Sequence, residues 1–191
     1  MTIEYSRKRI SDEKLLKHYL KGDQEAISVL VKRHQKSIYN LSFRFMGNSQ
    51  DAWDATQETF IRLIKKANSF RGISKFSTWI YRITCNVCKD ILKKRKKSKA
   101  YSYEEQKLKK RAASKDKFYE AMDRILEAEE IDEIQNLLQK LPPKLKIVTV
   151  LNDIYNFKYK EISKILNIPL GTVKSRVSRS REILRNFLKQ K

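Results

Sequence analysis

Hydroxyl and cationic side chains share one face of the C-terminal segment of this 191-residue chain. Apolar residues recur there at three- and four-residue steps, which places Val173, Val177 and Leu184 on the opposite face of a helix. Short hydroxyls and long cations are the side chains that contact base edges and phosphates in a DNA major groove. The candidate nucleic-acid contacts are Thr172, Lys174, Ser175, Arg176, Ser178 and Arg179.

Two predicted helices position this face. The apolar pattern predicts helices from Tyr159 to Leu166 and from Leu170 to Lys189, separated by a short turn around Pro169. Two helices joined by a tight turn, with a basic second helix, are typical of a helix-turn-helix. An αα-hairpin with a charged face is the alternative. Arg181 and Arg185 lie further around the second helix, where they fit phosphate contacts or salt bridges within the domain.

Composition favours an all-helical protein that binds a polyanion. Only four Gly and three Pro occur, too few for the turns of a strand-rich fold. With 43 basic and 22 acidic residues, the net charge of +21 attracts nucleic acid or, as a second candidate, an anionic membrane surface. No apolar run reaches the ~18 residues that span a bilayer, and no signal peptide is visible. We expect a cytoplasmic protein without membrane insertion.

No group of residues typical of catalysis stands out. Cys85 and Cys88 share a helical face, but His18 and His34 lie far upstream, so two reduced, half-buried thiols are favoured over a metal or redox site. We find no nucleophile–base pair and no Gly-rich phosphate loop. The sequence therefore predicts no enzymatic activity, no metal and no cofactor.

Four amphipathic helices are predicted in the N-terminal half. Ser11-Asp12 and Asp23 are candidate caps of the first two helices, and Met46-Gly47-Asn48 ends the second. The third helix is expected from about residue 49 to 67 and the fourth from about 77 to 94, after a loop over 68–76.

The composition changes after the fourth helix. A strongly basic run over 93–97 is followed by few apolar residues until Phe118, which predicts a linker. An acidic helix from about Lys117 to Lys140 and another from about Lys144 to Asp153 are expected next. We predict two small helical domains, 1–97 and 128–191, each able to bury its own core, joined by a flexible basic linker over 98–127. The basic half of the linker fits DNA phosphates, a protein partner or solvent.

The C-terminal domain carries a recognisable pattern. Its residues are Tyr159-Lys160-Glu161-Ile162, the run from Gly171 to Val177 and the run from Arg179 to Glu182, preceded by Leu141-Pro142. These stretches resemble region 4 of bacterial sigma factors of the extracytoplasmic-function group. The resemblance implies that the candidate nucleic-acid contacts read a −35 promoter element. The commonest family residues are replaced at three positions: Asn156 for Gly, Ser163 for Ala and Ser180 for Ala.

The N-terminal domain carries two further patterns. The segment 51–60 resembles sigma region 2.2, which implies docking on the clamp of RNA polymerase through Asp51, Asp54, Gln57 and Glu58. The last three share one helical face by spacing, which by itself favours a solvated face; the resemblance is what favours the docking surface. The segment 70–86 resembles regions 2.3 and 2.4, which capture a flipped base of the −10 element and contact the duplex upstream of it. The implied −10 contacts are Phe70, Arg71, Ser74, Lys75, Phe76, Trp79, Arg82 and Asn86.

Aromatic surface and cations are what an extruded base and a separated strand require. Phe76 and Trp79 fit a place in the core as well. The resemblance as a whole implies a promoter-specificity subunit that binds core RNA polymerase at its clamp and flap elements, together with promoter DNA, and that is controlled by an anti-sigma factor. The alternatives are a free-standing helix-turn-helix repressor or activator, and an enzyme that modifies nucleic acid.

Overall fold

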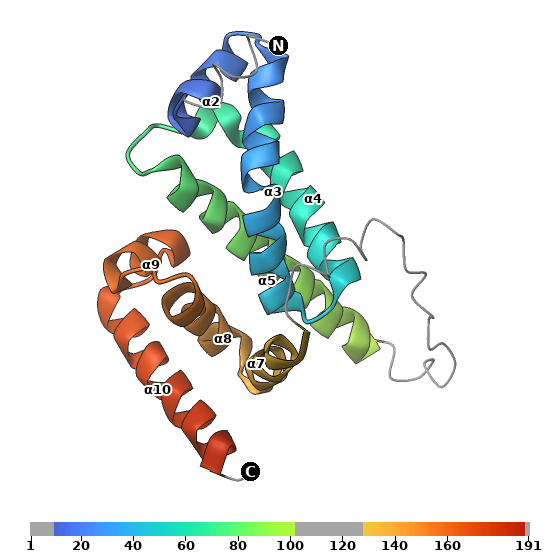
Figure 1. Cartoon of the computed structure of the whole chain (residues 1–191), viewed down its shortest axis with the longest axis vertical. Coiled ribbons are helices and arrows are strands. Elements are labelled where there is room, and N and C mark those ends of the chain that lie inside the picture. The colour runs from blue at the N-terminus through green and yellow to red at the C-terminus, as the bar shows by residue number, and fades with distance from the viewer. Residues whose placement is uncertain (1–9, 102–127, 190–191) are drawn as a thin grey trace.

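The computed structural model describes residues 10–101 and 128–189, and within these ranges the elements are helical (Figure 1). The N-terminal module consists of four α-helices and a short 3-10 turn. Its elements are α2 (Asp12–Leu20), α3 (Gln24–Met46), α4 (Ser49–Lys66), η1 (Ala67–Ser69) and α5 (Phe76–Tyr101). The predicted all-helical class is confirmed.

Side-chain caps set the helix boundaries of this module. Ser11 Oγ accepts the Lys14 amide at the start of α2 at 3.4 Å, and Asp23 Oδ1 accepts the Glu25 amide at the start of α3 at 3.1 Å. Such caps satisfy amides that have no partner within the first helical turn. At the end of α3, Gly47 takes a left-handed conformation with φ +81°. The predicted caps and the predicted end of the second helix are confirmed.

The fourth helix is longer than the sequence pattern indicated. α5 starts one residue before the expected position 77 and continues to Tyr101, beyond the expected end near 94. Lys and Arg are good helix formers, so a basic run need not end a helix even where its apolar stripe stops. The first four residues of the expected linker thus belong to α5. The remainder, 102–127, and the start of the helix expected from Lys117 lie outside the described residues.

The C-terminal module contains the predicted helix-turn-helix. Its elements are α7 (Ala128–Lys140), α8 (Pro143–Thr149), the π-helical turn η2 (Val150–Ile154), α9 (Tyr159–Leu166) and α10 (Leu170–Lys189). The boundaries of α9 and α10 are those predicted. The π-helical turn was not predicted. Asn156, which stands where the family most often has Gly, has φ +55°, and Asn tolerates this left-handed conformation better than most residues.

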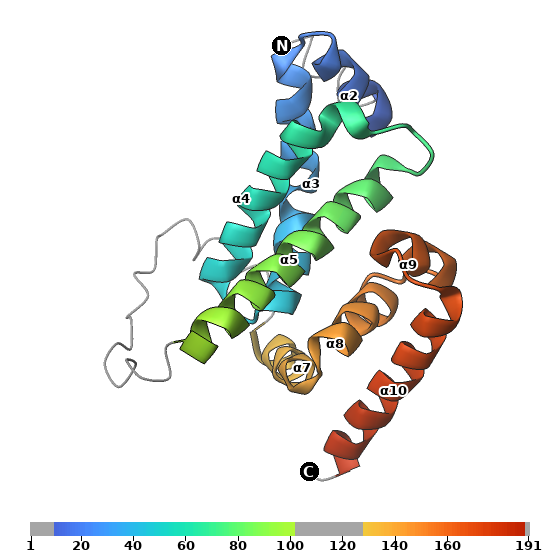
Figure 2. The ribbon, with the colours of Figure 1, turned by 180° about the vertical axis from the view of Figure 1, so that it is seen from behind.

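The two modules pack against each other. Figures 1 and 2 show α7, α8 and α9 alongside α3 and α5, with α10 on the far side of its module. One hydrophobic cluster runs through both modules, so in this arrangement their cores are continuous. The ring of Tyr81 on α5 lies 5.7 Å from that of Tyr155 and 5.2 Å from that of Phe157. Aromatic rings at these distances and tilts pack favourably.

Polar contacts reinforce the join between the modules. The ammonium of Lys146, on α8, is buried and donates to Gln139 Oε1 at 2.5 Å and to the Phe45 carbonyl of α3 at 3.4 Å. Burial lowers the pKa of this ammonium. Gln135 of α7 donates to the Phe43 carbonyl at 3.1 Å. These contacts satisfy groups that would otherwise be buried without partners.

Two further sequence predictions concern the cysteines and membrane insertion. Cys85 and Cys88 are free thiols and fully buried, rather than half-buried as predicted. Burial raises the pKa of both, that of Cys88 to about 12, so both are protonated and unreactive near neutral pH. Among residues 10–101 and 128–189, no helix is long and apolar enough to cross a membrane.

Candidate nucleic-acid and polymerase interfaces

The exposed face of α10 carries most of the candidate −35 contacts. Lys174, Ser175, Ser178 and Arg179 are exposed, and Thr172 and Arg176 are half-buried. Their helix is held from the opposite side by a buried apolar stripe that includes Val173 and Val177. The structure thus brings the six predicted residues onto one helix whose cations and hydroxyls reach solvent. This arrangement fits insertion into a major groove.

The turn between α9 and α10 is closed by one of the residues that depart from the family pattern. Ser163 Oγ donates to the Ile168 carbonyl at 2.6 Å, while Asn167 takes a left-handed conformation with φ +51°. Ser180, the third departure, is fully buried and donates to the Val177 carbonyl at 2.8 Å. Both hydroxyls therefore have acceptors, and neither costs the domain an unsatisfied polar group.

A hollow of about 540 Å³ opens beside the α10 face. Its lining includes Lys174 and Ser178 from the candidate −35 set and, further along the helix, Arg181 and Arg185. Arg181 pairs with Asp153 at 2.5 Å and donates to Asn152 at 3.1 Å. The sequence predicted either phosphate contacts or a salt bridge within the domain for Arg181, and the structure shows the salt bridge. Arg185 is exposed at the edge of the hollow.

The candidate −10 contacts surround the loop 70–75, between η1 and α5. Phe70 and Trp79 are half-buried with ring centroids 5.1 Å apart, and both pack on Phe76 at 6.0 and 5.9 Å. Phe76 is fully buried, so it supports the other two rings and has no surface of its own for a base. Of the two predictions for Phe76, the structure has the core position. Trp79 also packs on Phe76, but it is only half-buried, so its position is compatible with either prediction.

The tip of this loop holds a residue that the sequence prediction missed. Ile73 is 85% exposed, an unusual position for a large apolar side chain. Its neighbours Arg71 and Lys75 are exposed, and Ser74 is half-buried. An apolar side chain at an exposed tip can pack on a base that has left the stack. A signal was present in the sequence, since an isolated Ile follows Gly72 inside an otherwise polar loop.

The last two candidate −10 contacts lie on α5, and the structure treats them differently. Asn86 is exposed. Arg82 is half-buried and donates through Nη2 to the carbonyl of Lys164, on α9 of the other module. Its Nε is buried and has no hydrogen-bond partner among the described residues. The guanidinium therefore contacts the helix-turn-helix, and α9 packs against this part of α5.

The candidate polymerase face lies on α4. Asp54 and Gln57 are exposed, and the nearest polar contact of Asp54 is the Gln50 amide at 3.5 Å. Glu58 pairs with Arg62 at 2.7 Å, and Arg62 bridges to Asp90 of α5 at 2.6 Å. Both acidic partners raise the pKa of Arg62. Carboxylates and an amide therefore line one exposed strip of the helix.

Asp51 does not belong to this strip. Only 5% of the residue is exposed, and its carboxylate accepts from Asn48 Nδ2 at 2.6 Å and from Arg95 of α5. In return Asn48 Oδ1 accepts the Asp51 amide at 2.9 Å. This reciprocal pair caps α4 in the manner of a capping box. The structure thus gives Asp51 a role in starting the helix.

Comparison with known proteins agrees with this geometry. Residues 30–98 match the family described as Sigma-70 region 2, and residues 131–184 match the family described as Sigma-70, region 4. The ECF RNA polymerase sigma factor SigW of Bacillus subtilis is 37% identical over 180 residues, which cover 93% of this chain and 96% of that protein. The chain belongs to the ECF sigma factors.

Further sigma factors from other bacteria are similar over comparable lengths. The sigma-E factor of Escherichia coli K12 is 32% identical, covering 93% of this chain and 94% of that protein. The sigma-H factor of Pseudomonas aeruginosa is 32% identical, covering 91% of each. Solved structures share the fold: CnrH in complex with the cytosolic domain of CnrY has a TM-score of 0.67 at 23% identity, covering 94% of this chain and 97% of that one. The sigma factor RpoE in complex with the anti-sigma factor NepR from Bartonella quintana has a TM-score of 0.66 at 20% identity, covering 85% and 96%.

Proposed function

We propose that this ECF sigma factor binds core RNA polymerase and directs initiation at promoters with −35 and −10 elements. The observation that carries the proposal is the pair of surfaces on one chain. A region 4 module exposes a hydroxyl and cationic helix face, and a region 2 module exposes an aromatic and basic loop. In this assignment the α10 face reads the −35 element, and the surface around Phe70, Trp79 and the loop 70–75 takes the −10 element. We place the region 2 module before and the region 4 module after the linker expected over 98–127, of which the first four residues belong to α5.

Core polymerase would be held through Asp54, Gln57 and Glu58 on α4, with the clamp as the partner element, while the flap would contact the region 4 module. The α4 strip is acidic within a chain of net charge +21, so it is suited to a basic protein surface and not to DNA. Asp51 is left out of this contact set because its carboxylate is buried and already paired.

The two modules must separate for both promoter elements to be read at once. Elements named for positions 10 and 35 lie roughly 85 Å apart along a duplex that rises ~3.4 Å per base pair. In the packed arrangement α9 contacts α5, and Arg82 donates to a carbonyl of α9. The 26 residues of 102–127 can reach at most roughly 90 Å when extended, which is enough. Release of Arg82 from Lys164 frees its guanidinium for the −10 duplex.

Reconstitution with core RNA polymerase tests the function. The purified chain should bind core enzyme and support run-off transcription from a promoter selected with the holoenzyme. The double variant Gln57→Ala, Glu58→Lys should lose core binding and remain folded by circular dichroism. Lys32→Glu, a charge reversal on an exposed position of α3, is the control and should bind normally. If the purified chain does not bind core enzyme but binds an operator by itself, the protein is a free-standing repressor or activator.

We further propose control by an anti-sigma factor. CnrH and RpoE, which share this fold, were solved with the cytosolic domain of CnrY and with the anti-sigma factor NepR. A partner that covers the α4 strip would compete with core polymerase. A captured partner should compete with core enzyme for the parent chain. The same partner should fail to bind the Gln57→Ala, Glu58→Lys variant. A partner that binds the holoenzyme without displacing core polymerase would exclude this mode of control.

A further inference from the structure

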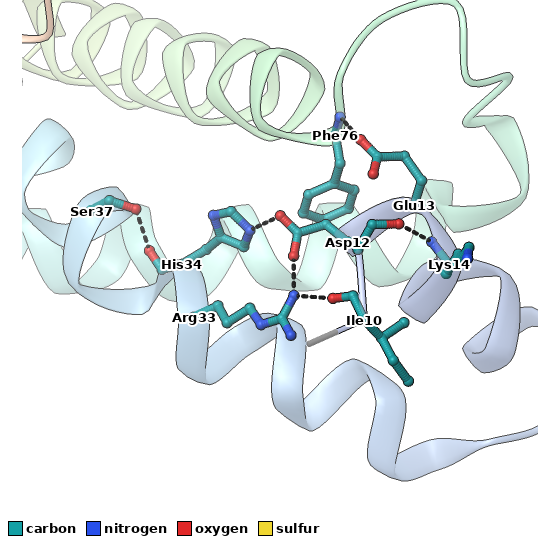
Figure 3. A network of polar contacts seen from close by, with 9 residues as sticks. Ile10, Asp12, Glu13, Lys14, Arg33, His34, Ser37 and Phe76 are labelled. Atoms are coloured by element: carbon teal, nitrogen blue, oxygen red, sulfur yellow. Dashed lines mark hydrogen bonds and ion pairs between the residues drawn. The ribbon is translucent and has the colours of Figure 1, made fainter. Parts of the chain in front are cut away.

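The start of α5 is fastened to α2 by a contact that spans most of the N-terminal module. Glu13 Oε1 accepts the backbone amide of Phe76 at 2.9 Å, although the two residues are 63 positions apart (Figure 3). Phe76 is the first residue of α5, so its amide has no partner within the helix. A carboxylate there also interacts favourably with the positive end of the helix dipole. Glu13 therefore caps α5 from another helix.

The carboxylate of Glu13 is itself held in place. Leu15 and Leu16 anchor α2 in the core with 0% and 1% exposure. The neighbouring Asp12 accepts from Arg33 Nη1 at 2.7 Å and shares a hydrogen bond with His34 Nε2 at 2.8 Å, both on α3. Figure 3 shows Asp12 between these two side chains, with Glu13 directed to Phe76. Two carboxylates in sequence thus join α2 to α3 and to α5.

Phe76, whose amide donates to Glu13, connects the loop 70–75 to the aromatic cluster of Phe70, Phe76 and Trp79. Phe76 lies between the ring of His34 at 5.2 Å and the rings of Phe70 and Trp79. Among the described residues, the loop 70–75 itself makes no hydrogen bond to α2 or α3. A shift of the Phe76 amide would therefore move the exposed loop tip and the half-exposed rings together.

We propose that Glu13 is a positioning residue for promoter opening, which holds the loop 70–75 and Trp79 in the geometry that receives an unstacked −10 base. The inference rests on the proposed −10 role of this loop. Glu13 itself touches no DNA. It acts through the Phe76 amide, because a base-capturing surface must be in place before the strands separate if it is to lower the cost of opening.

Substitutions at Glu13 separate this role from a general effect on folding. Glu13→Ala removes the acceptor, whereas Glu13→Gln keeps an acceptor oxygen. Lys17→Ala, at an exposed position of the same helix, is the matched control. In the free chain, Glu13→Ala should raise amide hydrogen exchange at Phe76, while the other two variants should not. Unchanged exchange in Glu13→Ala would overturn the proposal without reference to polymerase.

Transcription supplies the functional readout. With core polymerase, Glu13→Ala should lower run-off from a duplex promoter about tenfold, the equivalent of one charge-assisted hydrogen bond. It should recover most activity on a promoter already unpaired across the −10 element, and Glu13→Gln should stay within about twofold of the parent. Equal losses on both templates would indicate a merely structural role and overturn the proposal. Trp79→Ala is the reference variant for the −10 assignment. If Trp79→Ala initiates normally on the duplex promoter, the −10 assignment fails. The exchange result then still decides whether Glu13 fixes the loop.

Discussion

Asp51 and Asp54 are two carboxylates on one helix for which the structure gives opposite expectations. Asp51 is buried and paired with Asn48 and Arg95, whereas Asp54 is exposed. Replacement of Asp51 by Ala leaves Asn48 without its side-chain acceptor. A charge-assisted hydrogen bond of this kind contributes about 1.5–3 kcal/mol when buried, and we take the lower end because Asn48 is exposed.

The pairing with Arg95 adds less. The Arg95 side chain is 47% exposed, and solvent screening limits such a pair to about 0.5 kcal/mol. The free energy of unfolding should therefore fall by about 2 kcal/mol in Asp51→Ala. One kcal/mol corresponds to about 2–4 °C in a chain of this size when it unfolds as a unit, so the expected loss in Tm is about 4–8 °C. The shared hydrophobic cluster supports unfolding as a unit.

The assay combines calorimetry with titration of core polymerase. Asp51→Ala should lose thermal stability and, well below its Tm, bind core enzyme like the parent chain. Asp54→Ala should change the free energy of unfolding by less than about 0.5 kcal/mol and weaken core binding. Asp51→Asn, which keeps an acceptor for Asn48, should fall between Asp51→Ala and the parent in Tm. A thermally normal Asp51→Ala that fails to bind core polymerase would refute the capping role and restore the contact predicted from sequence.

Three further predictions concern DNA binding, acid and the join between modules. Arg179→Ala should weaken −35 binding by about 1–3 kcal/mol and relax its sequence preference in fluorescence anisotropy, whereas Arg185→Ala, at the exposed edge of the hollow, should weaken all sequences mildly. Burial alone would raise the pKa of Asp12, but hydrogen bonds and charge from its two α3 partners lower it below 3.8. Its stabilising effect is thus present above pH 3.8 and lost as the pH falls below that value, and Asp12→Asn should flatten the acid limb of Tm against pH. Gly47→Ala and Gly22→Ala should each cost about 1–2 kcal/mol of backbone strain in urea unfolding, because both glycines have positive φ. Gly47→Ala should cost more, because its Cβ would lie 2.7 Å from the Gln139 side chain, which cannot move without disturbing its hydrogen bond to Lys146, whereas a Cβ at 22 would meet nothing within 4 Å.

Local pattern was sufficient for the helices. The three- and four-residue spacing of apolar side chains predicted the boundaries of α9 and α10, and capping residues predicted where α2 and α3 begin. These features depend on neighbours within one or two helical turns, which the sequence displays directly. The end of α5 could not be read in this way, because basic residues continue a helix after its apolar stripe has ended.

Local pattern was not sufficient for the functional surfaces. Spacing put Asp51 near Asp54, and it put Phe76 near Trp79, but only the packed structure separated the buried member of each pair from the exposed one. Helical periodicity tells which residues share a face. Whether that face meets solvent depends on which other element covers it.

What the sequence by itself determined was therefore the set of helices, the two-module order and the chemistry of the α10 face. The tertiary structure decided which of those side chains remain available. It paired Glu13 with the Phe76 amide across 63 positions and turned Arg82 toward α9 of the other module. Such partners meet only when helices pack, since the hydrogen bonds and ion pairs that fix a site join residues far apart in the chain, and no local spacing encodes them.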